Sequence, residues 1–295
     1  MVLINIVLGA AGLAAGLRLL PRDVGDRAVS IDVLGSALLA ACMLGLLSGL
    51  IQGSTDGWTS APVAALAAGV IFFAAFAQRQ RTAAAPLIKP SLLRNRGFTA
   101  GLILGLVSFG TVAGLLYAVS LFLQRGVGYS PERAAVTGFA PAAAGIVIAS
   151  VACRNLLTRL GRRLSLAGIV VTVGGVAVLA AIVARTGTAA SAAELSPAMT
   201  LIGLGMGATF STIYDIAIGD IDPAEAGRAS GSLSSIQQLA NAIGAAVITT
   251  IYFGALAGGP AHAMTLSLLT VIALGVLSCL AIPLLPRHAQ PAGPH

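Results

Sequence analysis

The chain of 295 residues is 57% hydrophobic and only 9% charged, with a formal net charge of +7 and a mean hydropathy of +0.95. A soluble domain carries about 25% charged residues because its surface faces water, so this composition excludes a soluble protein and indicates one that is embedded in a lipid bilayer. The basic residues lie in short segments between long apolar runs, which is typical of membrane topology and argues against nucleic acid as a partner.

Nine apolar runs are each long enough to cross a bilayer, for which a helix needs about 20 residues. In chain order they are Val2–Leu20, Ile31–Ile51, Ala61–Ala77, Phe98–Leu123, Ala134–Cys153, Leu164–Ala184, Pro197–Ile218, Leu233–Leu256 and Met264–Leu285. Lipid cannot satisfy exposed backbone amides, and runs of this length satisfy them as helices. We therefore expect an all-α integral membrane protein with about nine transmembrane helices.

The basic residues alternate between the connections that join these runs. If odd-numbered connections are cytoplasmic, that side holds every Lys and Arg of the chain except Arg125, Arg133 and Arg185. Because cytoplasmic loops are enriched in Lys and Arg, we expect a multi-pass protein of the plasma (inner) membrane. Its N-terminus lies outside and its C-terminus lies in the cytoplasm. Asp32 then begins the second run, where we expect a solvated acid at a helix start.

The middle runs carry a few polar groups and one proline. Ser108, Thr111 and Tyr117 lie in the fourth run, and Pro141 lies in the fifth, where it indicates a helix bend that serves packing. The following connection carries a basic cluster, Arg159, Arg162 and Arg163. This cluster either fixes topology and contacts anionic headgroups or takes part in gating.

Small residues and one acid share a stripe in the run Pro197–Ile218. The stripe repeats every four residues as Gly203, Gly207, Ser211, Asp215 and Gly219. Glycines at this spacing allow a neighbouring helix to approach closely. An ionisable group inside a span is a functional hypothesis by default, so Asp215 is the candidate for proton coupling. The alternative is that Asp215 reaches cytoplasmic water or pairs with Arg228.

The next run, Leu233–Leu256, carries amides along one helical face. A spacing of three or four residues places six side chains on one side of this helix: Gly231, Ser234, Gln238, Asn241, Ala245 and Thr249. Such a face is costly against lipid, so it points to protein or to a water-filled cavity. Its amides either hydrogen-bond to a neighbouring helix or contact a substrate.

Reactive side chains show no catalytic or metal-binding pattern in the sequence. Cys42, Cys153 and Cys279 lie far apart, within or beside apolar runs, without the spacing of a metal site or of a disulfide framework. His262 lies in an expected outer loop, and the two other histidines lie in the tail. We therefore expect no enzyme, no metal site and no cofactor.

Residues 219–254 resemble the penultimate-helix region of fourteen-span drug:proton antiporters of the major facilitator superfamily. That region has a P-x-E-x-A-G-x-A-S-G loop and a helix with x-x-Q-L-x-x-A-x-G. The matching residues are Pro223, Glu225, Ala226, Gly227, Ala229, Ser230, Gly231, Gln238, Leu239, Ala242 and Gly244. The segments INIVLGAAGLAAGLRLLP, LLRNRGFTAGLILG and SLFLQRGVGYSPERAAVTGFAPAAAG are similar to its sixth, ninth and tenth spans. TRLGRRLSLAG resembles a weak copy of the superfamily's cytoplasmic gating loop, with Thr158 where the stronger copy has an aspartate.

The resemblance implies a division of the chain into four parts. Residues 1–20 are the last helix of an N-terminal half, 21–97 hold two linking transmembrane helices and a cytoplasmic loop, 98–286 form a complete six-helix C-terminal half, and 287–295 are a cytoplasmic tail. Such halves are built as 3+3 inverted repeats, with substrate held between two halves. Spans one to five are missing, so we expect the missing N-terminal half to be supplied by the same gene or by another chain.

The resemblance also implies a function and its residues. We expect proton-coupled efflux of hydrophobic drugs or metabolites by alternating access, with the lipid bilayer, a small hydrophobic substrate and protons as partners. Asp215 is the proton-coupling candidate, and Arg159, Arg162 and Arg163 are gating-loop candidates. The substrate-cavity candidates are Ser108, Thr111, Tyr117, Ser211, Gln238 and Asn241, and the helix-packing residues are Gly203, Gly207, Gly231 and Pro141. The alternative is a non-transporting membrane fragment or one subunit of a split membrane assembly.

Overall fold

The computed structural model describes residues 9, 12–18, 32–83, 86, 94–153, 156, 160–218, 221 and 223–282, and every regular element among them is helical. Seven helices of this part are long and apolar enough to cross a membrane. They comprise Val33–Gly53, Ser60–Thr82, Gly97–Gly126, Pro131–Ala152, Arg162–Ala189, Ala229–Gly254 and Pro260–Leu280. This confirms the all-α membrane protein that the sequence predicts.

The two remaining predicted spans differ from these seven. The run Val2–Leu20 lies mostly outside the described residues, as do Arg159 and the tail 287–295. The run Pro197–Ile218 forms α10 (Ala192–Ile218), a helix of 27 residues, which is long enough to cross a membrane.

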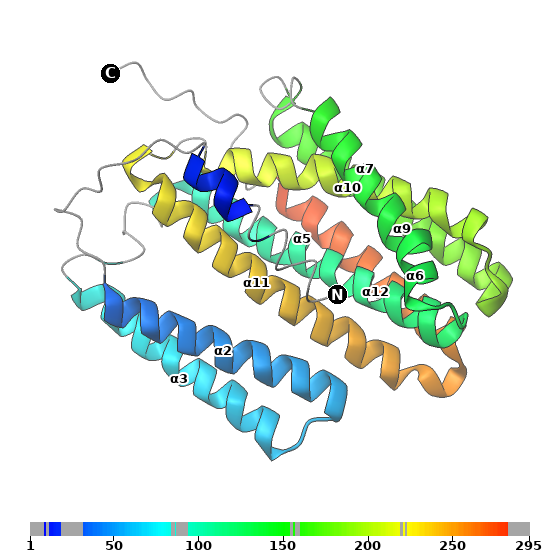
Figure 1. Ribbon diagram of the computed structural model, residues 1–295, viewed down its shortest axis with the longest axis horizontal. Helices are drawn as coiled ribbons and strands as arrows, with labels where there is room; N and C mark the ends of the chain where they lie inside the picture. The colour runs from blue at the N-terminus through cyan, green and yellow to red at the C-terminus, as the bar shows by residue number, and fades with distance from the viewer. Residues whose placement is uncertain are drawn as a thin grey trace.

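Helices α2 (Val33–Asp56) and α3 (Ser60–Thr82) form an antiparallel hairpin, and α2 rests on α11 (Pro223–Gly254) (Figure 1). Glycines allow α2 and α3 to touch, since a Cβ on Gly45 would lie 2.8 Å from the backbone of Gly69. Asp32 caps α2 by accepting a hydrogen bond from Gly35 N at 3.0 Å, and Arg79 Nη2 lies 3.2 Å from Asp32 Oδ1.

Asp32 therefore differs from the solvated acid that the sequence suggested. Its side chain is only 3% exposed, because the end of α3 brings Arg79 over the start of α2. The hydrogen bond from Gly35 N and the Arg79 guanidinium hold the pKa of this carboxyl below its usual range. The ion pair between Asp32 and Arg79 links the start of α2 to the end of α3.

The remaining helices form one bundle around α5. Helix α5 (Arg96–Leu121) continues as the π-helical turn η1 (Phe122–Gly126), and α6 (Pro131–Ala134), the π-helical η2 (Ala135–Phe139) and α7 (Ala140–Ala152) together form the next rod. Then follow α9 (Arg162–Thr186), η3 (Gly187–Ala189), α10, α11, η4 (Leu256–Gly258) and α12 (Pro260–Ala281).

The packing of these helices has a pseudo-two-fold pattern. Helix α5 lies against α11, α10 lies against α7, and α9 lies against α12 (Figure 1). Suppose that α5 is exchanged with α10, α7 with α11 and α9 with α12. The contact between α5 and α11 then becomes the contact between α10 and α7, and the contact between α9 and α12 is unchanged. That pattern is the one expected of two inverted three-helix repeats.

Glycines allow close helix contact at both of the equivalent crossings, α5 with α11 and α10 with α7. A Cβ on Gly244 of α11 would meet the carbonyl oxygen of Gly110 on α5, and a Cβ on Gly203 of α10 would meet that of Ala142 on α7. Lipid provides no hydrophobic drive between helices, so such close approach and its van der Waals contacts stabilise the bundle.

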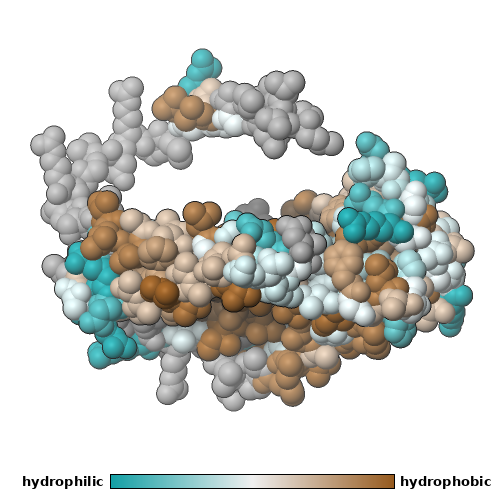
Figure 2. Space-filling model, turned by 90° about the horizontal axis from the view of Figure 1, so that it is seen from below, coloured by the Kyte–Doolittle hydropathy of each residue, from teal (hydrophilic) through white to brown (hydrophobic). Residues whose placement is uncertain are grey.

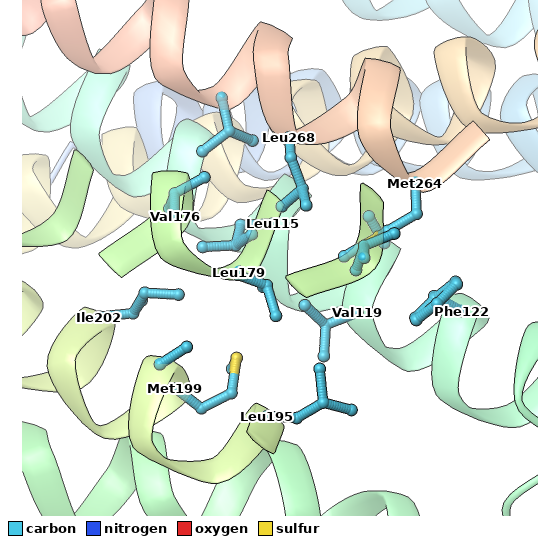
Figure 3. Close-up of a cluster of buried hydrophobic side chains, with 14 of the residues drawn as sticks. Leu115, Val119, Phe122, Val176, Leu179, Leu195, Met199, Ile202, Met264 and Leu268 are labelled. Atoms are coloured by element: carbon cyan, nitrogen blue, oxygen red, sulfur yellow. The ribbon is translucent and has the colours of Figure 1, made fainter. Parts of the chain in front are cut away.

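The bundle has an apolar core and an apolar outer surface. Figure 3 shows the core, to which α5, η1, α9, α10 and α12 contribute side chains that are at most 3% exposed: Leu115, Val119, Phe122, Val176, Leu179, Leu195, Met199, Ile202, Met264 and Leu268. On the outside, Leu44 and Leu280 are 71% and 70% exposed. Figure 2 shows hydrophobic side chains over much of one face and hydrophilic ones gathered towards its two ends, as a bilayer requires.

Candidate functional site

Helix α11 presents amide and hydroxyl side chains on one face within its span, and this is its amide-bearing face. Gly231, Ser234 and Gln238 are exposed and Asn241 is half-buried, whereas Ile248 on another side of the helix is fully buried. Asn241 Nδ2 donates to Gln238 Oε1 at 3.4 Å, so the two predicted candidates lie together. A Cβ on Gly231 would meet nothing within 4 Å, so the structure places this glycine in open space.

The neighbouring amide, Gln237, has a different role. Tyr214 Oη of α10 donates a hydrogen bond to Gln237 Oε1 at 2.7 Å. This bond joins α10 to α11, two helices that otherwise touch only lightly. Sequence reasoning missed the pair, because Tyr214 and Gln237 are distant in sequence and neither lies on the predicted polar stripe.

The small-residue stripe of α10 changes character along the helix. Gly203 and Gly207 are buried against α7, where a Cβ on Gly207 would lie 2.5 Å from the carbonyl oxygen of Ile146. Ser211 is half-buried and donates to its own helix at Gly207 O at 2.8 Å. Asp215, one turn further, is exposed. The stripe thus begins as a packing surface and reaches an exposed carboxylate at Asp215, and its last predicted member, Gly219, lies outside the described residues.

The three candidates on α5 separate onto two sides of the helix. Ser108 and Thr111 are both 7% exposed and line a small pocket between α5, α9, α10 and α12. Tyr117 is 41% exposed. Nine residues correspond to two and a half turns of a helix, so Tyr117 faces opposite to Ser108. The structure therefore brings Ser108 and Thr111 together and keeps Tyr117 apart from them.

Pro141 lies at the start of α7, directly after the π-helical turn η2. A proline inside a helix lacks a backbone donor and clashes with the preceding turn. The π-helical turn Ala135–Phe139, whose backbone bonds span five residues, directly precedes this proline. Prolines and π turns are both places at which helices bend, and the bend at Pro141 stays a prediction.

Arg162 and Arg163 form the first turn of α9. A helix N-terminus favours negative charge, yet this turn holds no acid. Two guanidinium groups at this position are therefore not explained by helix stability. Their place at one end of a span fits contact with anionic headgroups and equally a loop that pairs with another segment.

Comparison with known proteins identifies the family to which the chain is similar. The model of the Major Facilitator Superfamily matches residues 3–245. The probable actinorhodin transporter of Streptomyces coelicolor is 34% identical over 259 residues, which cover 86% of this chain and 45% of that protein. The puromycin resistance protein of Streptomyces alboniger is 31% identical, covering 82% of this chain and 48% of its own length. The tetracenomycin C resistance and export protein of Streptomyces glaucescens is 29% identical, covering 83% and 45%. The chain spans about half the length of the curated relatives it matches.

Proposed function

The chain belongs to the major facilitator superfamily, and we propose that it forms part of a transporter that exports hydrophobic drugs or metabolites across the plasma (inner) membrane. The names of the relatives support this proposal, since they are a transporter, a resistance protein and an export protein. We propose a transporter rather than an enzyme. The orientation that we propose, with the N-terminus outside and the C-terminus in the cytoplasm, rests on the distribution of Arg and Lys.

The observation that carries the proposal is the exposed polar surface on α11 and α10. Ser234 and Gln238 are exposed on α11, which also exposes the apolar side chains Ile243 and Val247, and Asp215 is exposed on α10. Polar groups inside a span are costly against lipid and mark substrate or ion pathways. We propose that a second six-helix half, in the same polypeptide or in another chain, faces this surface, and that substrate passes between the two.

The candidate residues divide into two groups on this basis. Tyr117, Ser211, Gln238 and Asn241 are accessible or half-buried, so they are the stronger candidates for substrate contact. Ser108 and Thr111 are buried and line a pocket with residues of α9, α10 and α12 instead. Arg162 and Arg163 stay candidates for gating together with Arg159.

We further propose that Asp215 carries the coupled proton. A carboxylate near the cytoplasmic end of α10 can exchange protons with water in one conformation and become enclosed between two halves in the other. The alternative for this residue is a structural pairing. A chain that moves no substrate, alone or with a second half, is the competing hypothesis for the whole molecule.

The test is efflux of a fluorescent hydrophobic cation such as ethidium from cells that make the chain together with the proposed second half. We expect energised cells to export the dye, and Asp215→Asn to abolish the export that depends on the proton gradient. Glu194→Gln is the matched control, since Glu194 is an exposed acid at the other end of the same helix and accepts hydrogen bonds from Ser191. Undiminished efflux by Asp215→Asn would refute the proton role, and absence of any efflux would favour the non-transporting alternative.

A further inference from the structure

Helices α10 and α11 carry the two sites proposed above, but they pack mainly against other helices. Helix α10 lies mainly against α7 and α9, whereas α11 lies mainly against α5 and α2. Asp215 is exposed on α10, and Gln238 is exposed on α11. Exchange of a proton for a substrate requires that the state of one site changes the other. The direct contacts between α10 and α11 therefore bear on how the two sites are coupled.

A hydrogen bond joins the two helices directly. Tyr214 Oη donates to Gln237 Oε1 at 2.7 Å, which is the usual distance for a well-formed bond of this type. Each partner is the immediate neighbour of a proposed functional residue, since Tyr214 precedes Asp215 and Gln237 precedes Gln238. The bond therefore holds the helical turn that carries Asp215 against the turn that carries Gln238.

The bond lies on the packed side of α11. Leu233 and Ala240 are four residues before and three residues after Gln237, so they share its side of the helix. Both are fully buried, in an apolar cluster against which Tyr214 also packs. Gln238 is about 100° further round the helix and is exposed. A shift of Gln237 on the packed side thus also turns the exposed amide.

The Tyr214 ring makes a separate contact with α5. It meets the ring of Phe109 edge-on, with 6.1 Å between the ring centroids, and the ring of Phe210 lies 4.7 Å from that of Phe109. Phe109 is 1% exposed, so these contacts hold the Tyr214 ring in place. Tyr214→Phe keeps the ring and removes only the hydroxyl, so it separates the hydrogen bond from the ring packing.

We propose that Tyr214 is a positioning residue that links the proton site at Asp215 to the substrate surface at Gln238. This inference rests on the roles proposed above for these two residues. Loss of the charge at Asp215 changes the contacts of α10, and the bond from Tyr214 to Gln237 moves α11 together with α10. Without the hydroxyl, α10 moves and the amide-bearing face of α11 stays where it is.

Other charged residues belong to the same end of the bundle. Asp220, Asp222 and Glu225 follow Asp215 in the chain, and the helices packed against α10 begin with several arginines, whereas α7 carries no charged residue. The arginines are Arg96 of α5, Arg162 and Arg163 of α9, and Arg228 of α11. The three acids would titrate together with Asp215. The test therefore neutralises Asp215 by substitution and not by a change of pH.

The first test does not depend on transport. In the detergent-solubilised full chain, with the three native cysteines replaced, Gln238→Cys carries an environment-sensitive fluorophore such as bimane. We expect Asp215→Asn to shift the emission of this label, and we expect Tyr214→Phe to remove most of that shift. Absence of a shift in the chain that keeps Tyr214, or a full shift in Tyr214→Phe, would overturn the proposal.

Tyr129→Phe is the matched control for this experiment. Tyr129 Oη also donates to a distant segment, at 3.3 Å from Ala190 O, and Ala190 lies before the opposite end of α10 from Asp215. Tyr129→Phe should keep the full shift, and loss of the shift in both tyrosine variants would show a structural effect only and overturn the positioning role. Gln237→Met removes the acceptor instead of the donor and serves if Tyr214→Phe fails to fold. The two substitutions together should lose no more of the shift than either alone.

A transport measurement separates this inference from the proposed function. In proteoliposomes that contain the chain and the proposed second half, the number of protons moved for each ethidium exported should fall several-fold in Tyr214→Phe. The KM for ethidium should not change, and Tyr129→Phe should keep the full ratio. An unchanged ratio in Tyr214→Phe, where Asp215→Asn abolishes coupling, would refute the positioning role alone. Absence of ethidium transport by the unmodified chain would refute the proposed function, and the fluorescence result would then decide the role of Tyr214.

Discussion

Gly244 occupies the closest backbone crossing between α5 and α11, and its replacement by alanine tests how the bundle is held together. The added Cβ would meet the carbonyl oxygen and the Cα of Gly110, which are backbone atoms that cannot turn aside as a side chain does. The two helices must then separate along their contact. Introducing a methyl group into a tightly packed site costs about 1–3 kcal/mol, and alanine returns up to about 1 kcal/mol through its better helix propensity.

Gly231→Ala is the matched control on the same helix, because a Cβ there would meet nothing within 4 Å. It keeps the gain in helix propensity without the clash, so it should be neutral or stabilise by up to about 1 kcal/mol. We therefore expect the free energy of unfolding of Gly244→Ala to be lower than that of Gly231→Ala by about 1–3 kcal/mol. Titration with SDS in mixed micelles, followed by circular dichroism, measures that free energy. If Gly244→Ala is as stable as Gly231→Ala, the close crossing of α5 and α11 is wrong.

Three further predictions concern the hairpin, the tie between α10 and α11, and the topology. Tyr214→Phe removes the hydrogen bond to Gln237 and should lower the free energy of unfolding by about 0.6–1.7 kcal/mol, whereas Tyr117→Phe, at an exposed site, should not. The pKa of Asp32 is lowered in the folded chain, so its stabilising contribution is present above about pH 4 and is lost as the pH falls through the folded value. Acid titration of unfolding should show this loss, and Asp32→Asn should be less stable at neutral pH and lack it. Reporter fusions at Trp58 and Arg162 should lie on opposite sides of the membrane, and the same side for both would contradict the proposed topology.

Hydropathy and length predicted the helices well, because a bilayer imposes the same requirement on every span. Seven predicted runs became membrane-length apolar helices, and α10 formed where its run was placed. The prediction that Asp32 lies at a helix start is confirmed, but the prediction that its carboxylate is solvated is wrong. Only the fold brings Arg79, 47 residues away, onto this carboxylate.

The candidate surface was predictable where it depends on one helix. A helical period places Ser234 and Gln238 on one face, but it does not tell which part of that face is exposed, since Thr249 of the same predicted face is 1% exposed. The same period places Ser108 and Tyr117 on opposite sides of their helix, but only the structure shows that Ser108 is on the buried side.

Features that depend on pairs of helices could not be predicted from the sequence. The Tyr214–Gln237 bond and the Gly110–Gly244 crossing each join two helices whose relative rotation no local pattern specifies. Repeated small residues indicate that a close contact exists, but they do not name the partner helix.

The central claim is that the polar face of α11 borders a water-filled path, whereas its other exposed side borders lipid. Gln238 and Ile243 lie on α11 and are both exposed, but only Gln238 belongs to the polar face. With the three native cysteines replaced, Gln238→Cys should react with a hydrophilic, membrane-impermeant maleimide in vesicles that contain the proposed second half. A transported hydrophobic compound should slow that reaction, and Ile243→Cys should stay unreactive. Equal reactivity of the two positions, or an unreactive Gln238→Cys, would contradict the account.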